Sequence, residues 1–329
     1  MNELIPTRLT SEAIKEKAIS LGADLVGIAD GALMDKFPPD SANPRTPSHI
    51  TDIDGARVIV LAKRISFATS RLPAWNDQHK FYGDELLISA LEELALDLVI
   101  WLEDNGAPGL LVPYHHVDPL KFVKGEDTQA TRPLSAAHAA VEAGLGTLGL
   151  NQQLITPEYG PRVILGLVLT SADIEPDSMM EEVLCRGPEC GRCLMACPAD
   201  AVQHWDRDWE ACDKYLSPFG FEFLSDYLTN VLKEPDQANK IGMLRGMESS
   251  EIFQAMLRGS GIITGCRRCA DVCPVGDDYE ELLKKWVDEI PEETPEKLKR
   301  LEVMITEASL PTSYEKQKRW IGNFKPRGQ

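Results

Sequence analysis

The chain has 329 residues, and 43% of them are hydrophobic, which is enough for one large domain or two smaller ones with a buried core. Its 52 acidic and 34 basic residues give a net charge of −18, which disfavours binding to the phosphate backbones of nucleic acids. The N-terminus shows no secretory pattern, and acidic residues interrupt the most apolar segment, 86–102, at helical spacing. We therefore expect a soluble, cytoplasmic protein with no membrane contact.

The first half of the chain alternates between predicted helices and apolar strands. In chain order, the sequence predicts a helix, a glycine turn and a strand over 11–30, a strand over 56–66, a long amphipathic helix over 81–106, a strand over 109–116, a helix over 134–146 and a strand over 161–171. This alternation indicates a layered α/β (α+β) fold.

The character of the sequence changes at about Glu181, where cysteines appear and apolar strands give way to helical or irregular segments. We therefore divide the chain into an α/β domain over 1–178, a cysteine-containing domain over 179–285 and a charged helical tail over 286–329.

Two runs of cysteines have the spacing of a bacterial ferredoxin motif. That motif is C-x2-C-x2-C-x3-C-P, and its fourth cysteine binds the other cluster. The run "CGRCLMACP" at 190–198 matches its last three cysteines and the proline, and so does "CRRCADVCP" at 266–274. Cys185 and Cys212 can supply the two missing first ligands. The eight cysteines then form two sets of four: Cys185, Cys190, Cys193 and Cys273; and Cys197, Cys212, Cys266 and Cys269.

This arrangement predicts two [4Fe–4S] clusters close together, which would carry single electrons. Structural zinc is the alternative, because paired C-x2-C motifs also bind zinc. Zinc sites do not require the cysteine–proline continuation, which occurs in both runs. Disulfides are not expected, because cytosolic thiols stay reduced.

The segments "SLGADLVGIAD" (20–30), "AGLGTLGLNQQLITPEYGPRVILGLVLT" (143–170) and "WEACDKYL" (209–216), together with the cysteine runs, resemble the cobalamin-dependent iron–sulfur reductases. This group comprises the reductive dehalogenases and the epoxyqueuosine reductases. The resemblance implies a nitroreductase-like domain that holds base-off cobalamin, followed by a ferredoxin-like domain. It also implies a cytoplasmic ferredoxin or flavodoxin as electron donor, a small organic substrate, and a fold compatible with a homodimer.

Several residues are candidates for contact with this cofactor. The glycines Gly144, Gly146 and Gly149 permit close approach to a flat ligand, although a tight turn would need them equally. The segment "TPEYGPR" predicts a rigid loop, and the end of the 109–116 strand is where ligand clefts form in α/β folds. The remaining candidates are Tyr114, His116, Thr156, Tyr159 and Gly160.

Two residues are candidates for the chemistry. Arg162 is placed like the family's active-site arginine, and a surface ion pair is its alternative role. Tyr82 stands where the resemblance suggests a tyrosine proton donor, whose pKa a nearby cation would lower, and a packing role is equally compatible with its position.

The sequence also departs from both branches of the family. Epoxyqueuosine reductases resemble one another in an aspartate proton donor before the proline aligned to Pro133, where this chain has Ala130 and Thr131. The respiratory dehalogenases resemble exported proteins with a twin-arginine leader, which is not seen here. We expect reductive dehalogenation, with epoxyqueuosine-type deoxygenation of tRNA and a corrinoid-free electron-transfer protein as the alternatives.

Overall fold

In a computed structural model of the chain, the described residues are 9–72, 77–112, 133–216, 221–257, 266–286, 290–306 and 312–321. Their largest sheet has four antiparallel strands in the order β1-β2-β6-β3. The strands are β1 (Leu25–Asp30), β2 (Arg57–Arg64), β6 (Val163–Thr170) and β3 (Gly109–Val112). The expected mixture of helices and strands is confirmed, and the antiparallel pairing places the sheet in the α+β class.

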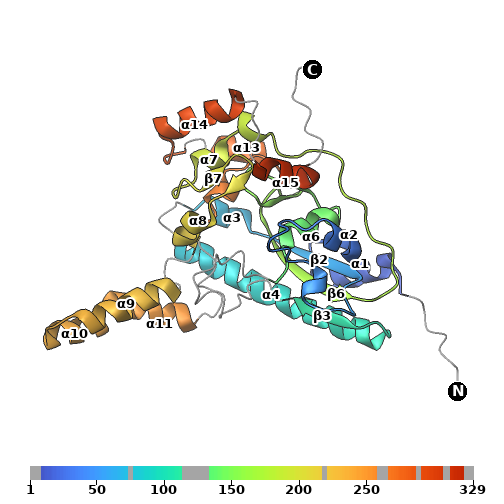
Figure 1. Cartoon of the computed structure of the whole chain (residues 1–329), viewed down its shortest axis with the longest axis horizontal. Helices are drawn as coiled ribbons and strands as arrows, with labels where there is room; N and C mark the ends of the chain where they lie inside the picture. Colours follow the sequence, from blue (N-terminus) through green and yellow to red (C-terminus); the bar gives the residue numbers. More distant parts are fainter. Residues whose placement is uncertain are drawn as a thin grey trace.

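Both faces of this sheet are buried, because apolar residues fill the middle of its central strands, over 58–62 in β2 and 163–169 in β6. In β2, Val58, Val60 and Ala62 point to one core, whereas Ile59 and Leu61 point to the other. The second core is covered by α1 (Ser11–Ser20) and by the long helix α4 (Asp77–Asp104). Figure 1 shows α4 running along the sheet.

The first core is covered by α6 (Ala136–Glu142) and by segments that lie far away in the sequence. Leu194, Trp205 and Trp320 share this core with the sheet residues. They lie in or beside α7 (Arg192–Met195), the hairpin of β7 (Val202–Gln203) and β8 (Asp206–Arg207), and α15 (Thr312–Ile321). One buried core therefore crosses the boundary that the sequence places near residue 178, and the division into three domains stays a prediction.

The C-terminal helices pack on the body. Arg319 in α15 forms a bidentate ion pair with the buried Glu142, at 2.8 Å for each bond, and Trp320 donates a hydrogen bond to the same carboxylate. In α14 (Pro295–Thr306), Lys297 is buried. The charged segment that the sequence suggested as a tail is thus helical and partly built into the core.

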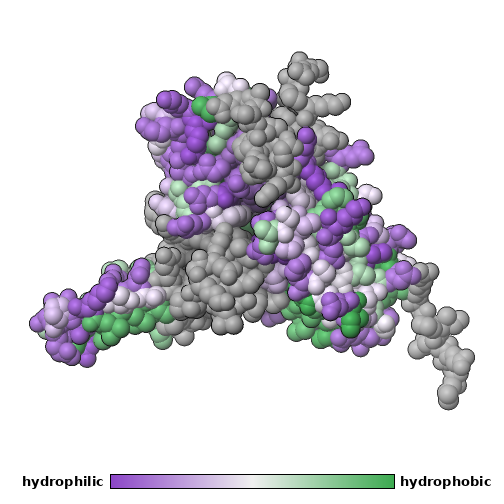
Figure 2. Space-filling view, in the orientation of Figure 1, coloured by the Kyte–Doolittle hydropathy of each residue, from purple (hydrophilic) through white to green (hydrophobic). Residues whose placement is uncertain are grey.

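The remaining elements are short or belong to the cysteine region. They are α2 (Gly31–Lys36), η1 (Pro47–His49), α3 (Phe67–Ser70), β4 (Thr147–Leu148), β5 (Leu154–Ile155), η2 (Gly187–Glu189), α8 (Trp209–Leu216), α9 (Phe221–Lys233), α10 (Gln237–Leu244), α11 (Met247–Leu257), α12 (Arg268–Asp271) and α13 (Tyr279–Trp286). Helices α9 to α11 form an arm that extends from the body (Figure 1), and apolar side chains line one edge of it (Figure 2). No helix of the described ranges is both long and apolar enough to span a membrane.

Most predicted elements are present, with small shifts. Helix α4 begins four residues before the predicted start at 81, and α6 is shorter than predicted because Gly144, at φ +72°, follows its end. The predicted strand over 109–116 is β3 as far as Val112, and its remainder lies outside the described residues.

Candidate functional site

All eight cysteines lie among the described residues, and each is an unpaired thiol that is buried or half-buried. They come from two parts of the chain that pack against each other through α7 and α12. In chain order they are Cys185, Cys190, Cys193, Cys197, Cys212, Cys266, Cys269 and Cys273.

A tight turn accommodates the two extra residues between Cys185 and Cys190. The segment between these cysteines contains the one-turn helix η2 (Gly187–Glu189), with Pro188 in its first turn. Gly187 has φ +62° and Gly191 has φ +58°, a region that glycine adopts without strain. A Cβ at Gly187 would press against Trp205, and one at Gly191 would press against Leu301. The unusual spacing is therefore a packed feature of the fold.

The first group of thiols interacts electrostatically around Cys273. Burial raises the pKa of the Cys273 thiol to about 12, and negative charge on Cys185 and Cys190 contributes to that rise. Burial also raises the pKa of Cys193 well above its ordinary range, with Cys185, Cys269, Cys273 and Cys190 adding to the effect. Cys185, Cys190, Cys193 and Cys273 are therefore mutual neighbours.

The second group interacts around Cys266 and Cys269. Burial raises the pKa of Cys266 to about 12, and the charges of Cys269, Cys197 and Cys212 contribute. Burial raises the pKa of Cys269 as well, while the cation of Arg207 opposes that rise. Cys197, Cys212, Cys266 and Cys269 thus form a second neighbourhood, and the interaction between Cys193 and Cys269 links the two.

Hydrogen-bond donors point at the sulfur atoms of both groups. The backbone N–H groups of Leu150 and Gly187 donate to Cys185 Sγ at 3.4 Å, and that of Ala201 donates to Cys197 Sγ at 3.2 Å. Such donors stabilise thiolates and tune iron–sulfur clusters. A buried thiol with a raised pKa stays protonated at neutral pH unless a metal replaces its proton.

Iron–sulfur clusters and zinc make different demands on the thiols. A zinc ion would draw four sulfurs to about 2.3 Å from one point. A four-iron cube places each thiolate on a different iron. Within the described part of the chain, no three Cys, His, Asp or Glu side chains are arranged to hold one metal ion, and the choice of iron–sulfur clusters stays a prediction.

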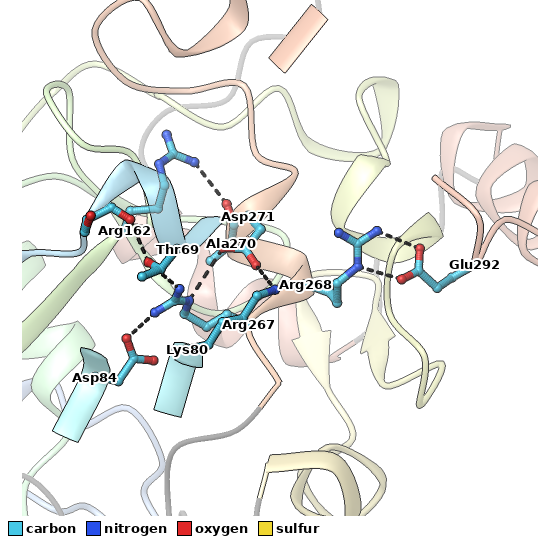
Figure 3. Close-up of polar contacts among 10 residues, drawn as sticks. Thr69, Lys80, Asp84, Arg162, Arg267, Arg268, Ala270, Asp271 and Glu292 are labelled. Atoms are coloured by element: carbon cyan, nitrogen blue, oxygen red, sulfur yellow. Dashed lines mark hydrogen bonds and ion pairs between the residues drawn. The ribbon is translucent and has the colours of Figure 1, made fainter. Parts of the chain in front are cut away.

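A buried ionic network joins helix α4 to the second cysteine run (Figure 3). Lys80 Nζ lies 3.0 Å from Asp271 Oδ2. Arg267 bonds Asp84, donates to Thr69 Oγ1 at 2.9 Å and lies 3.5 Å from Asp271 Oδ1. Burial raises the pKa of Asp84 to about 6, although Arg267 opposes the shift. Sequence reasoning missed this network, because its members are distant along the chain.

Arg162 lies beside this network and is only 2% exposed. Its Nη1 atom donates to the carbonyl oxygens of Ala270 and Cys273 at 3.0 and 2.9 Å, and its Nη2 atom donates to that of Val275. The guanidinium also stacks on the ring of Tyr279, 3.1 Å from the ring centroid. These contacts hold the turn that carries Cys273, and a catalytic role for Arg162 stays a prediction.

The structure does not bring Tyr82 to Arg162. Lys80 and Asp84 are buried in the ionic network, whereas Tyr82, half a turn away on α4, is 52% exposed. The aromatic ring that contacts Arg162 belongs instead to Tyr279, whose pKa is raised by burial although Arg162 opposes the shift. The proton-donor role of Tyr82 remains a prediction.

The glycines and the "TPEYGPR" loop are explained by contacts within the protein. Gly144 has φ +72° and approaches the Ser178 carbonyl oxygen, and Gly146 approaches that of Ile155 so closely that a Cβ would clash. Gly149 packs on Ile155, and Gly160, at φ +56°, approaches the Val275 carbonyl oxygen.

A side-chain hydroxyl closes the "TPEYGPR" loop. Thr156 Oγ1 accepts from Tyr159 N at 3.1 Å and donates to the Gly160 carbonyl oxygen at 3.3 Å. The predicted ligands Tyr114 and His116 lie outside the described residues, as do Ala130 and Thr131. Contact of these glycines and of this loop with a corrinoid therefore stays a prediction.

Two buried cations that sequence reasoning missed support the cysteine turns. Lys297 Nζ donates to the carbonyl oxygens of Met195, Cys197 and Glu292 at 2.7–2.9 Å. Arg207 Nη2 donates to Cys269 Sγ at 3.4 Å, and its Nη1 lies 4.0 Å from Cys212 Sγ. Neither lysine nor arginine has a motif that would mark this role in the sequence.

Comparison with known proteins relates the chain to two kinds of reductase. It is 37% identical over 86 residues to an epoxyqueuosine reductase of Listeria monocytogenes, which is 26% of this chain and 22% of that protein. It is 39% identical over 83 residues to a tetrachloroethene reductive dehalogenase of Desulfitobacterium hafniense, which is 24% of this chain and 14% of that protein. These matches span less than a quarter of each relative's length. No protein-family model matches the chain.

A solved structure has the same fold over almost the whole chain. The structure of a catabolic reductive dehalogenase covers 94% of this chain and 37% of its own, with a TM-score of 0.52 and 16% identity. An epoxyqueuosine reductase solved with a tRNA stem loop aligns with a TM-score of 0.48 and 22% identity, over 87% of this chain and 69% of its own.

Proposed function

We propose, given that the chain is a homologue of both reductive dehalogenases and epoxyqueuosine reductases, that it is an iron–sulfur reductase that cleaves a carbon–heteroatom bond. The observation that carries this proposal is the arrangement of eight buried or half-buried cysteines in two groups of four, which the packing of α7 against α12 brings together. Two such groups suit two [4Fe–4S] clusters that pass electrons from one to the other.

The residues around the thiols suit this role. Cys185, Cys190, Cys193 and Cys273 would hold the first cluster, and Cys197, Cys212, Cys266 and Cys269 the second. Each cysteine–proline segment crosses from its own run to the other group. Cys197 ends the first run but belongs to the second group, and Cys273 ends the second run but belongs to the first group. This crossing keeps the two clusters close, as electron transfer requires.

We propose reductive dehalogenation of a small organic substrate as the reaction. Two electrons and one proton would replace a carbon–halogen bond by a carbon–hydrogen bond and release a halide ion. The net charge of −18 supports a small-molecule substrate, since it repels a phosphate backbone. The electron donor we propose is a cytoplasmic ferredoxin or flavodoxin, with a homodimer as the assembly.

Epoxyqueuosine-type deoxygenation is the second candidate, supported by the 37% identity to an epoxyqueuosine reductase. It would require tRNA to bind despite the charge of the chain. A solved epoxyqueuosine reductase holds a tRNA stem loop, so tRNA belongs in the test. The third candidate function is that of an electron carrier with no substrate of its own.

Base-off cobalamin is the further cofactor that the sequence resemblance implies. Carbonyl oxygens of the protein itself fill the space beside Gly144, Gly146 and Gly160, so packing explains these three glycines without a ligand. We therefore assign no step to a corrinoid, and we treat its binding as a separate question for experiment.

The test is anaerobic reconstitution with iron and sulfide, with and without cobalamin, followed by removal of free ligand. The reduced protein is then offered a panel of aryl and alkenyl halides and, separately, an epoxide-containing tRNA stem loop. Halide release supports dehalogenation, and loss of the epoxide with tRNA retention supports the second candidate. If neither the halides nor the tRNA reoxidise the cluster-loaded protein, with or without retained cobalt, both candidate reactions are overturned. The remaining candidate is then an electron carrier.

A further inference from the structure

The guanidinium of Arg207 lies among the thiols of the second group. Arg207 Nη2 lies 3.4 Å from Cys269 Sγ and Nη1 lies 4.0 Å from Cys212 Sγ. The side chain is buried, so its charge faces these sulfurs with little screening by water.

The fold fixes Arg207 in this place. It is the last residue of the β7–β8 hairpin, and its guanidinium stacks on the ring of Trp209, 4.7 Å from the centroid. The backbone N–H of Arg207 donates to Asp206 Oδ1 at 2.8 Å. Its Nε atom has no hydrogen-bond partner, and within the described ranges the side-chain contacts of its Nη atoms are to sulfur. The sulfurs are therefore its charge partners.

Within the described part of the chain, no cationic side chain donates a hydrogen bond to a sulfur of the first group. Cys185 receives only backbone N–H groups, from Leu150 and Gly187. Arg186 is near Cys190 and Cys273, but it is 51% exposed and pairs with Glu280 at 3.1 Å. Arg162 is buried and its charge opposes the rise in the pKa of Cys273, but its Nη atoms donate to carbonyl oxygens rather than to sulfur.

We propose that Arg207 is a positioning residue that gives the cluster held by Cys197, Cys212, Cys266 and Cys269 a higher reduction potential than the other cluster. The inference rests on the proposed function, because it requires both clusters. Reduction adds a negative charge to a cube that four thiolates already make negative. A buried cation in contact with two of those sulfurs stabilises the reduced form, and hydrogen bonds to sulfur act in the same direction. This cluster then accepts the electron first and holds it.

The test is a redox titration of the reconstituted full chain, followed by EPR, for the wild type and three variants. Arg207→Met removes the charge, Arg207→Lys retains it, and Arg186→Met removes an exposed charge near the other cluster. We expect Arg207→Met to disfavour reduction of one cluster at least tenfold, which is 59 mV for a one-electron couple. Arg207→Lys is expected to recover more than half of that shift, and Arg186→Met to change either cluster less than threefold.

Equal potentials in Arg207→Met and the wild type, with both clusters loaded, would overturn the inference. If Arg207→Met fails to load one cluster, wild-type protein labelled with 15N-arginine tests whether the guanidinium contacts a cluster. An electron–nuclear double resonance coupling from a guanidinium nitrogen to one reduced cluster supports the contact, and its absence refutes it. Iron and sulfide analysis keeps the two proposals apart, because a wild type that loads no clusters overturns the proposed function itself.

Discussion

Lys80 and Asp271 form an ion pair that is closed to solvent, with 3.0 Å between Nζ and Oδ2 and side chains 1% and 0% exposed. Lys80 lies near the start of helix α4, and Asp271 lies between Cys269 and Cys273. The pair therefore fastens the helix that covers the sheet to the turn that carries three cysteines. Folding of the sheet and shaping of the cysteine site are coupled through it.

Loss of one partner of this pair should destabilise the protein strongly. Lys80→Met leaves Asp271 buried with only the longer contact to Arg267, and we expect a loss of about 3 kcal/mol in the free energy of unfolding. Denaturant unfolding of the apoprotein measures it. The double variant Lys80→Met with Asp271→Leu should regain more than half of the loss, since it removes both charges. A double variant that is less stable than Lys80→Met would show that the pair does not act as a unit.

Lys297 should matter for cluster loading. Its Nζ atom binds the carbonyl oxygens of Met195 and Cys197, so Lys297→Met removes the support of the turn from Cys193 to Cys197. With the carbonyl oxygen of Glu292, three carbonyl oxygens would lose a charged donor, at a cost of about 1–3 kcal/mol of stability for each buried group left unpaired. We expect reconstituted iron per chain to fall by about half or more. Lys299→Met, at an exposed position of the same helix, is the control and should load like the wild type.

Gly146 tests whether its glycine serves the fold or a ligand. A Cβ at this position would clash with the Ile155 carbonyl oxygen, so Gly146→Ala should destabilise the apoprotein by about 1–3 kcal/mol without any cofactor present. Thermal unfolding measures the effect. Gly242→Ala is the matched control in helix α10, where a Cβ meets nothing, and it should be neutral or stabilising by up to about 1 kcal/mol. An apoprotein of unchanged stability with Gly146→Ala would assign this glycine to ligand contact.

His138 should make stability depend on pH. It is buried against Trp320, its Nδ1 lies 2.6 Å from Ser135 Oγ and its Nε2 lies 3.0 Å from Gln317 Oε1. Burial lowers its pKa from 6.5 to about 4, with a smaller contribution from Arg45, although the Gln317 contact opposes the shift. Between these values the unfolded chain binds a proton that the folded chain does not, so stability falls as pH falls from 6.5 to 4.

The full effect of this histidine is about 3 kcal/mol, present above pH 6.5 and lost by pH 4. Unfolding of the wild type and of His138→Phe at pH 7 and pH 4.5 measures it, and the variant should lose most of the pH dependence over that interval. Parallel slopes for the two proteins would mean that His138 is protonated in the folded state.

The sequence predicted the sheet strands well because they are short apolar runs, and both faces of the sheet are buried. The ferredoxin spacing also predicts two sets of four cysteines, with each cysteine–proline segment crossing to the other set, and the cluster assignment stays a prediction. Spacing could not indicate that the residues between Cys185 and Cys190 form a turn of helix packed on Trp205.

The supporting cations could not be predicted, because their partners are distant along the chain. Arg207 reaches Cys269 across 62 positions, and Lys297 reaches Cys197 across 100. Helix geometry explains why Tyr82 is exposed while Arg162 is buried, and their catalytic roles stay predictions. Lys80 and Asp84 occupy the buried face of α4, and a residue two positions from each lies on the opposite side.

The most direct measurement of the central claim is the iron and acid-labile sulfide content of the anaerobically reconstituted wild-type chain, with an EPR spectrum after reduction. Two four-iron clusters predict about eight irons and eight sulfides per chain and the signals of two interacting reduced [4Fe–4S] centres. Zinc bound without sulfide, or about four irons with no interaction in the spectrum, would contradict the assignment of eight cysteines to two clusters.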